Sequence, residues 1–566
     1  MAGDGGAAGA DGCDVDADCS NGVAEDGAEV CDAGACRAGN PPPTIVSFTP
    51  EDDAMGVEPD TSVVIEFSEP LDPTTVHATN IRVLDGETPV EGKLDYANGK
   101  VTFTPTSPLA LLAEYKLSVT KGVSDAAGAP LLQELASTFV VRDGAWHEPT
   151  TVAKDTKGQL SFELPMTADG SVLLVWSGSV SSYCPTWARW YLRGLAQGDV
   201  KALTIPGQTE CSQVSSASNA AGVAAVVWQE PDGQNGLDVS QQRAGAWDTP
   251  VRVSTDFFAE RPQVAVSPTG VTTLFDHSAS GPESTAWTTD GAGKWPTQGD
   301  VLSSFAVLGN TSVAFDAKGN GLAAWRASTS PATGIQRVAA SRFTPASGKW
   351  STAVELPGSV AATESLAAQR GVPVVAMDNE GGGMALWVDT SYPGKLMASR
   401  FAQSAWAEPV PLSGANTVDV LELPPALVFD GQSFVAAWTA KDSDNQYIYT
   451  ARYDLKTGWE PYEQQQAAAD GTSAAVMPAL VTDGRGTLLL VFAKGADPSY
   501  SLAYQRYSAQ TWGPIMAVPG GTITNQGFVG LGGLRLSMSP NGLAALAWTN
   551  YDAVKYVSAV RLASFY

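Results

Sequence analysis

The stretch DAKGNGLAAW at residues 316–325 decides the fold, because variants of it recur along most of the chain. Each copy is a polar turn followed by an apolar strand that ends in an aromatic residue, a pattern typical of a β-turn leading into a buried strand. The copies end at Trp176, Trp228, Phe275, Trp325, Trp387, Trp438, Phe492 and Trp548. Eight copies spaced by 47 to 62 residues predict eight structural units.

A second tryptophan element alternates with the first. In it, a turn containing Gly, Ser or Thr comes directly before Trp146, Trp247, Trp295, Trp350, Trp406, Trp459 and Trp512. The two elements hold thirteen of the sixteen tryptophans. We therefore interpret the tryptophan content as part of the architecture and not as a row of sugar platforms.

Each unit divides into four short strands, here named a to d. In the fifth unit they are PVVAMD (373–378), MALWVD (384–389), KLMASRF (395–401) and AWAEPVPL (405–412). Four-stranded meanders repeated at about 50 residues are typical of propeller blades. The d strand of one blade is then expected to lead across to the a strand of the next.

The two ends of the array predict how the ring closes. It begins with an isolated d-type segment, AWHEPTTVA at 145–153, and ends with a, b and c segments, the last being YVSAVRLASF at 556–565. One N-terminal strand added to three C-terminal strands covers an otherwise exposed sheet edge. The predicted fold class is thus all-β, and residues 143–566 form an eight-bladed β-propeller of four-stranded antiparallel blades, with the N-terminal strand closing the last blade.

Residues 41–142 form a separate β-rich unit, in which apolar and polar residues alternate between Gly, Pro, Asn and Asp turns. Its opening, PPTIVSFTPEDDAMGVEPDTSVVIEFSEPLDPTTV at 42–76, resembles the bacterial immunoglobulin-like domain of S-layer and other surface proteins. That resemblance implies a β-sandwich acting as a spacer or adhesion module, without catalytic residues. The unit has no cysteine pair of the antibody type and no core tryptophan.

Residues 1–40 are expected to contain a flexible Gly/Ala/Asp tether and a disulfide-linked segment. Four cysteines, Cys13, Cys19, Cys31 and Cys36, lie among residues too polar to form a core without cross-links. They predict two local disulfides, with three connectivities open. The pattern resembles the short Cys/Asp-rich modules of myxobacterial surface proteins. We expect an extracytoplasmic protein, secreted or at the outer cell surface, whose export signal has been removed and whose tether allows a lipid anchor upstream, as in a lipoprotein.

Calcium is the single cofactor that the sequence suggests. Asp14, Asp16, Asp18 and Glu25 occupy positions 1, 3, 5 and 12 of a calcium-loop template. The sixth position is Cys19 instead of glycine, and no flanking helices are predicted. The alternative is a disulfide knot with solvated carboxylates and no cofactor.

The overall charge restricts the partners. The chain has 60 acidic and 33 basic residues, a formal charge of -27 that repels nucleic acid and anionic membrane surfaces. The sequence contains no run of eighteen or more apolar residues, so it predicts no membrane span. The expected partner is a glycan or an envelope or surface protein.

Loop lengths predict which rim of the propeller carries function. The a-to-b and c-to-d turns are tight, whereas the b-to-c loops and d-to-a crossings are longer and share the opposite rim, here called the long-loop rim. Candidate binding residues in the b-to-c loops are Tyr183, His277, Tyr392, Asp442, Asp444, Tyr447, Tyr500 and Tyr551. Tyrosines on a wet rim suit glycan or protein recognition. The alternative is that they are ordinary loop residues.

Catalysis has little support in the sequence. The three histidines, His77, His147 and His277, fall in different parts of the predicted fold, so they form neither a triad nor a multi-histidine zinc site. We therefore expect a recognition or adhesion protein that is not an enzyme. Two alternatives are a structural component of an envelope or extracellular assembly, and a carbohydrate-active enzyme, a glycosidase or lyase, using a carboxylate pair such as Asp442 and Asp444.

Cys184 and Cys211 test this topology, because both are placed on the long-loop rim at the boundary of the first two blades. We predict that they form a disulfide, which stabilises the fold by roughly 3 to 4 kcal/mol through restriction of the unfolded chain. Peptide mapping without reduction should recover one fragment that contains both residues. Alkylation of both thiols in the native protein would contradict the prediction.

Overall fold

In a computed structural model, the described elements are β-strands and one short 3-10 helix, Pro73–Thr75. The chain divides into two compact units, Met1–Gly144 and Ala145–Tyr566. No helix among the described residues is long and apolar enough to span a bilayer. The structure describes residues 13, 19, 30–32, 35–37, 39–179, 185–203, 214–230, 236–254, 262–277, 284–303, 306–307, 311–328, 336–359, 372–389, 394–412, 417–418, 425–442, 445–465, 474–496, 499–524, 533–552 and 557–566.

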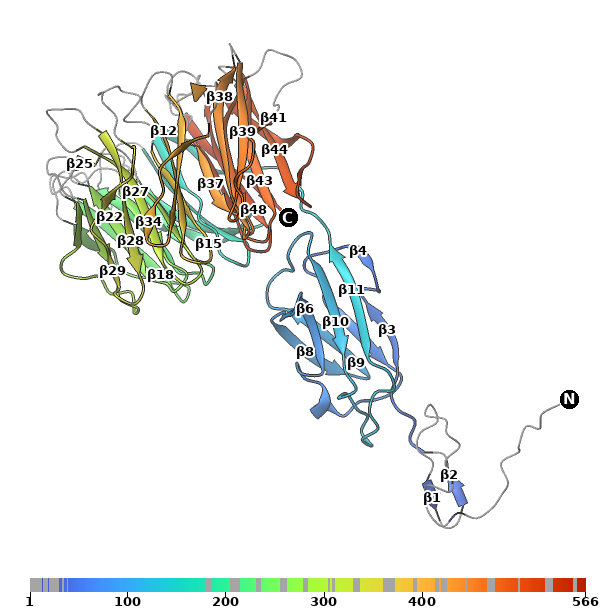
Figure 1. Cartoon of the computed structure of the whole chain (residues 1–566). Coiled ribbons are helices and arrows are strands. Elements are labelled where there is room, and N and C mark those ends of the chain that lie inside the picture. Colours follow the sequence, from blue (N-terminus) through green and yellow to red (C-terminus); the bar gives the residue numbers. More distant parts are fainter. Residues whose placement is uncertain are drawn as a thin grey trace. The chain divides into compact units, whose positions relative to one another are not determined.

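The first unit contains a sandwich of two antiparallel-rich sheets (Figure 1). One sheet has the order β3 (Ile45–Thr49), β5 (Val63–Phe67), β9 (Lys100–Pro105) and β8 (Gly92–Ala97). The other has the order β4 (Ala54–Val57), β11 (Leu135–Val141), β10 (Glu114–Val119), β6 (Ile81–Asp85) and β7 (Thr88–Pro89). Alternate residues are buried along the strands, as in Val63, Ile65 and Phe67, so the two inner faces form the core.

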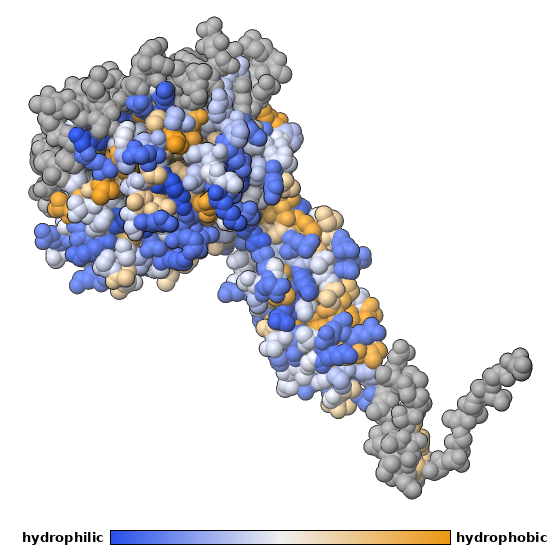
Figure 2. Space-filling model, in the orientation of Figure 1, coloured by the Kyte–Doolittle hydropathy of each residue, from blue (hydrophilic) through white to orange (hydrophobic). Residues whose placement is uncertain are grey.

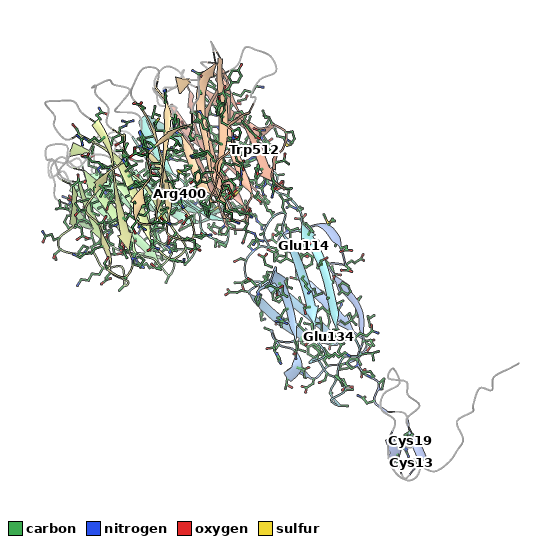
Figure 3. The ribbon with its side chains drawn as sticks, in the orientation of Figure 1. Cys13, Cys19, Glu114, Glu134, Arg400 and Trp512 are labelled. Carbon is green, nitrogen blue, oxygen red and sulfur yellow. A yellow bond between two sulfur atoms is a disulfide. The ribbon has the colours of Figure 1, made fainter. Side chains whose placement is uncertain are left out.

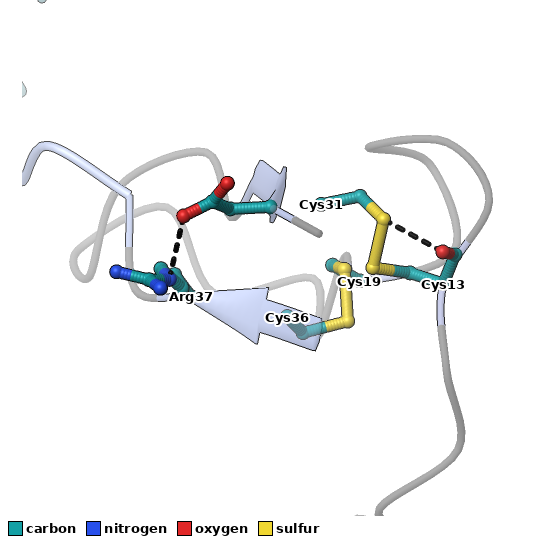
Figure 4. Close-up of a disulfide and its surroundings, with 6 residues drawn as sticks. Cys13, Cys19, Cys31, Cys36 and Arg37 are labelled. Atoms are coloured by element: carbon teal, nitrogen blue, oxygen red, sulfur yellow. Dashed lines mark hydrogen bonds and ion pairs between the residues drawn. A yellow bond between two sulfur atoms is a disulfide. The ribbon is translucent and has the colours of Figure 1, made fainter. Parts of the chain in front are cut away.

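The N-terminal segment has both expected disulfides among its described residues (Figure 4). Cys13 pairs with Cys31, and Cys19 pairs with Cys36. The hairpin of β1 (Val30–Asp32) and β2 (Ala35–Arg37) places Cys31 opposite Cys36, and each of them joins a different upstream cysteine. This connectivity selects one of the three that the spacing leaves open.

The strands of the second unit form consecutive antiparallel meanders, here called blades 1 to 8. The first four contain these strands: blade 1, β12 (Thr150–Glu163), β13 (Ser171–Ser179), β14 (Thr186–Leu192) and β15 (Leu195–Ala202); blade 2, β16 (Val214–Ser218), β17 (Ala224–Glu230), β18 (Gly236–Arg243), β19 (Ala246–Trp247) and β20 (Val251–Ser254); blade 3, β21 (Gln263–Val266), β22 (Thr272–His277), β23 (Ser284–Thr288) and β24 (Asp300–Ser303); blade 4, β25 (Ala306–Val307), β26 (Ser312–Phe315), β27 (Gly321–Ser328), β28 (Gln336–Thr344), β29 (Lys349–Trp350) and β30 (Val354–Glu355).

The remaining blades repeat this plan. Their strands are as follows: blade 5, β31 (Val374–Met377), β32 (Gly383–Val388), β33 (Leu396–Ala402), β34 (Ala405–Trp406) and β35 (Val410–Pro411); blade 6, β36 (Thr417–Val418), β37 (Ala426–Phe429), β38 (Ser433–Asp442), β39 (Asn445–Asp454), β40 (Gly458–Trp459) and β41 (Glu463–Gln465); blade 7, β42 (Ala474–Thr482), β43 (Leu488–Ala496), β44 (Ser499–Ser508), β45 (Thr511–Trp512) and β46 (Met516–Thr524); blade 8, β47 (Leu534–Met538), β48 (Ala544–Asp552) and β49 (Val557–Phe565).

Strand β12 closes the last blade and begins the first. Its N-terminal half pairs with β49, as in Thr150 opposite Leu562, and its C-terminal half pairs with β13, as in Phe162 opposite Trp176. The prediction that an N-terminal strand completes the last blade is thus confirmed, together with the all-β class of a sandwich followed by propeller blades. Since β12 belongs to both blades, the ring has no free edge at this seam.

Neighbouring blades pack face to face through apolar side chains. The b strands contribute to each of these clusters: Trp325 of blade 4 packs against blade 3, and Trp387 of blade 5 packs against blade 4. Phe275 packs in the opposite direction, against the following blade. The next residue, the buried Asp276, occupies the tryptophan position of blade 3. It follows the first residue of the preceding turn by nine positions, and the tryptophans of blades 4 and 5 follow the first residue of their turns by the same number.

The seam also contains an ion pair between the innermost strands of blades 8 and 1. Arg535 donates from Nε and Nη2 to the two carboxylate oxygens of Glu163, at 3.0 and 3.2 Å. The Glu163 carboxylate raises the pKa of Arg535. Ser537 Oγ donates to the Leu164 carbonyl beside it. These contacts join residues that are far apart in sequence, so they hold the ring closed.

We predict that Glu163→Gln and Arg535→Gln are coupled by about 1 kcal/mol in a double-mutant cycle of the free energy of unfolding, because the pair is bidentate and partly sheltered from water. Guanidinium denaturation followed by near-UV circular dichroism measures this energy. The exposed pair Lys318 and Glu380 is the control, and its cycle should show no measurable coupling. Equal coupling in the two cycles would contradict a special role for the seam.

Candidate functional site

The long-loop rim falls mostly outside the described residues. Among the residues outside the described part are Tyr183, Tyr392, Asp444, Cys184 and Cys211, so the predicted disulfide also lies outside it. The predicted calcium ligands also lie outside the described residues: Asp14, Asp16, Asp18 and Glu25. All of these assignments stay predictions.

The other predicted binding residues are on strands and not in loops. His277, Asp442 and Tyr551 end or nearly end β22, β38 and β48, and the backbone alone is described for them. Tyr447 and Tyr500 lie within β39 and β44 and are half-buried. Tyr447 packs against the apolar cluster between blades 5 and 6. The correction has a simple cause: the b and c strands of blades 6 to 8 pair further toward this rim than expected, as in Asp442 opposite Asn445.

The described residues contain one group of His, Cys, Asp or Glu side chains close enough to share a metal ion, namely Cys13, Cys19 and Cys36. All three sulfur atoms belong to disulfides. Metal ligation by cysteine requires a thiolate. This group is therefore a structural cross-link and does not form a metal centre.

On the opposite rim, arginines link successive blades. The aromatic residue of each b strand lies opposite a residue of the c strand, and the arginine follows that c-strand residue by three positions. These arginines are Arg342 in blade 4, Arg400 in blade 5, Arg452 in blade 6 and Arg506 in blade 7. Each guanidinium lies 4.3 to 5.1 Å from the centre of an aromatic ring in the following blade, a distance suited to cation–π attraction. We call this arrangement the arginine latch.

The latch in blade 5 is formed by Arg400, which is labelled in Figure 3. Arg400 pairs with the buried Asp378 and donates to the carbonyl oxygens of Gly383 and Phe401, at 2.7 and 2.6 Å. Its guanidinium then lies over the ring of Phe434 in blade 6, 4.9 Å from the ring centre. Asp378 also accepts backbone hydrogen bonds that form the turn between β31 and β32. One ion pair thus fixes a turn and the packing of the next blade.

Other hydrogen-bonding side chains bridge the first two junctions. Trp190 Nε1 donates to Gln242 Oε1 at 2.6 Å between blades 1 and 2. Gln241 Nε2 donates to the Gly293 carbonyl at 2.9 Å, and Arg243 Nη2 donates to the Gly270 carbonyl at 2.7 Å, between blades 2 and 3. The position of the latch is therefore occupied by a bridging group at these junctions as well.

The junction of blades 3 and 4 differs, because Thr288 stands at the latch position. It is the third residue after Thr285, the strand partner of Asp276. Its hydroxyl lies 3.1 Å from Thr273 Oγ1 within the same blade, and Trp350 Nε1 of blade 4 donates to that Thr273 oxygen at 3.2 Å. The turn aspartate is replaced too, by Ser267, whose Oγ accepts from the Val271 amide at 3.0 Å. Both charged partners of the latch are thus absent from blade 3.

A cleft opens where the latch is missing. Its volume is about 640 Å³. Blade 3 lines it with residues 288–291 and 294–297, and blade 4 lines it with Phe343 and Pro345. Trp295, which is half-buried, contributes to the cleft and also packs against the apolar cluster of blades 2 and 3. We take this cleft as the candidate functional site.

The sequence contained a signal for this site. Three consecutive blades read Ser-Arg-Phe, Ser-Arg-Phe and Ala-Arg-Tyr at 341–343, 399–401 and 451–453, whereas blade 3 reads Trp-Thr-Thr at 287–289. Alignment of the c strands alone reveals that threonine replaces arginine in blade 3. Whether this replacement opens a cleft depends on the side-chain contacts across the junction.

A buried arginine lies nearer the long-loop rim. Arg326, 2% exposed, follows Trp325 on β27 and donates from Nη2 to the Val388 carbonyl of blade 5 at 2.6 Å. Burial lowers the pKa of Arg326 to about 10, and the Asp389 carboxylate opposes that shift. The residue stays charged near neutral pH and connects blades 4 and 5.

Comparison with known proteins gives one family match. Residues 39–141 match the model described as a bacterial Ig-like domain, in agreement with the resemblance read from the sequence. The match covers the sandwich of the first unit and leaves the propeller unmatched. No curated protein sequence matches the chain.

Several solved structures resemble part of the chain. The Aleuria aurantia lectin, solved with Fucα1-6GlcNAc, is 15% identical over 56% of this chain and 98% of its own, with a TM-score of 0.31. An ulvan lyase is 9% identical over 60% and 89%, with a TM-score of 0.35. A protein of unknown function from Dyadobacter fermentans is 10% identical over 75% and 99%, also with a TM-score of 0.35. Scores of this size do not establish a common fold.

We predict that Arg400→Gln lowers the free energy of unfolding of the propeller by about 3 kcal/mol, because Asp378 then keeps a buried, unpaired charge. Adding Asp378→Asn to this variant should restore part of the loss. Lys349→Gln, which breaks an ion pair with an exposed lysine, is the control. Guanidinium denaturation measures all four proteins, and equal stability of the wild type and Arg400→Gln would show that the latch does not stabilise the ring.

Proposed function

We propose that this chain is a non-catalytic, extracytoplasmic recognition or adhesion protein whose propeller binds a glycan or a surface protein. In this proposal, the eight blades form one closed ring of the kind displayed by bacterial surface proteins, including those of myxobacteria. The observation that carries the proposal is the cleft between blades 3 and 4. It is a preformed opening in a ring whose neighbouring junctions are filled by bridging side chains.

The first unit supports the location. A match to a bacterial Ig-like domain suits a spacer that holds a binding module away from a surface. Two disulfides in the N-terminal segment suit an oxidising compartment. Attachment by a lipid anchor upstream of the tether is part of the same proposal.

The surface composition favours recognition over tight assembly. On the face shown in Figure 2, the exposed hydrophobic residues of the described part are interspersed with hydrophilic ones. A permanent structural interface would bury a broad apolar area. The net charge of -27 keeps copies of the chain apart by mutual repulsion. A recognition protein that stays separate until it meets its ligand fits these properties better.

The test is to screen the full chain against an array of bacterial and host oligosaccharides and against purified envelope proteins. We expect concentration-dependent binding without release of new reducing ends or unsaturated sugars. An equally acidic protein without a propeller is the control for charge effects. Turnover of a glycan would refute the non-catalytic reading, and absence of binding to both classes of partner would refute the recognition reading.

A further inference from the structure

We propose that the cleft between blades 3 and 4 binds a short segment of an uncharged glycan. This inference rests on the recognition function proposed above and adds its location and ligand class. The cleft volume of about 640 Å³ lies within the range of roughly 300 to 1,000 Å³ that is typical of small-ligand pockets. The opening comes from the replacement of the latch arginine by Thr288.

Val271 forms part of the apolar wall of the cleft. In blade 5 the equivalent residue is Gly382, where an added Cβ would lie 2.5 Å from Arg400 Nη2. Blade 3 has Val271 at the equivalent place, four residues after the start of its turn. The valine packs toward Phe343 and Trp350 in the cluster between the two blades. Its side chain lines the cleft as well.

Threonine hydroxyls supply the polar part of the lining. Thr288 Oγ1 lies 3.1 Å from Thr273 Oγ1, and Thr289 Oγ1 accepts from the Thr272 amide at 2.9 Å. Thr269 Oγ1 lies 3.0 Å from Ser267 Oγ. A hydroxyl has one hydrogen to donate and two lone pairs, so these bonds fix the side chains and leave further hydrogen-bonding capacity. Fixed hydroxyls suit a ligand that is itself rich in hydroxyl groups.

Apolar groups form the remaining walls. Trp295 is anchored on one side by the core of blades 2 and 3, and Pro296 and Pro345 are exposed beside it. Flat, rigid surfaces of this kind pack against the C–H faces of a sugar ring at little entropic cost. Apolar walls combined with hydroxyls match the mixed surface of a saccharide.

The charges at the cleft favour an uncharged ligand. Asp290 and Lys294 are both exposed in the lining, and their opposite charges cancel. Asp290 Oδ1 accepts from the amides of Ala292 and Lys294, at 3.0 and 2.9 Å, which fixes the turn that presents both side chains. An anionic glycan would meet no net positive charge here, and the field of the chain as a whole repels it.

The experiment uses the full chain and an array of neutral and anionic oligosaccharides, followed by calorimetric titration with the strongest neutral glycan. Thr288→Arg should lower the affinity about tenfold or more, since the long side chain fills the cleft. Thr297→Arg, at the exposed rim of the cleft, is a second variant that leaves the core unchanged. Ala402→Arg, which adds the same side chain at the exposed end of β33 in blade 5, should bind like the wild type.

The outcomes separate this inference from the proposed function. If the wild type binds a neutral glycan and both cleft variants, folded by circular dichroism, bind it equally well, the site lies elsewhere and the inference is wrong while the function stands. Binding of anionic glycans alone, or of a purified envelope protein alone, also overturns the inference and leaves recognition intact. Loss of binding in Thr297→Arg but not in Ala402→Arg supports it even if Thr288→Arg fails to fold.

Discussion

Each blade of the propeller has two apolar faces, and both must be covered by a neighbouring blade. A four-stranded sheet that leaves one face exposed loses the burial that drives folding. The described blades satisfy this requirement by packing in sequence, with clusters such as those of blades 3 and 4 or blades 5 and 6. The last blade packs against the first through residues such as Ala547 and Leu174. Ring closure is thus the condition for every other contact in the unit.

The arginine latch works within this constraint. Apolar packing is tolerant of small rotations, whereas a guanidinium that pairs with a buried carboxylate and lies over a ring in the next blade has one geometry. In blades 5 and 6, where Arg400 and Arg452 pair with buried aspartates, the latch therefore adds orientation to burial. Blade 3 lacks it, and the surrounding fold is retained because the apolar cluster beneath, including Phe275 and Trp350, remains complete. A site can open at the rim without loss of the core.

Sequence patterns predicted the fold well because burial is periodic. The alternation along strands, the recurring turns and the tryptophan at the end of each b strand all report which side chains face a neighbour. The pattern does not give the packing direction of Phe275, which packs against the following blade while Asp276 holds the tryptophan position. The assignment of Tyr447 and Tyr500 to loops was wrong, because strand length depends on pairing across the hairpin. To predict the cleft, one must know which side chains meet across a blade junction, and residue spacing alone does not show this.

The division of β12 between two blades has a consequence for the order of folding. Thr150 of this strand bonds to Leu562, 412 residues later in the chain. Contacts between such distant residues form slowly, because a long loop must close before they stabilise anything. During synthesis or export the sandwich of the first unit can fold early, while the strand that follows it waits for the final blade. For that period the unfinished propeller exposes two uncovered blade faces, the state in which a chain of this kind is most open to aggregation and most dependent on chaperones.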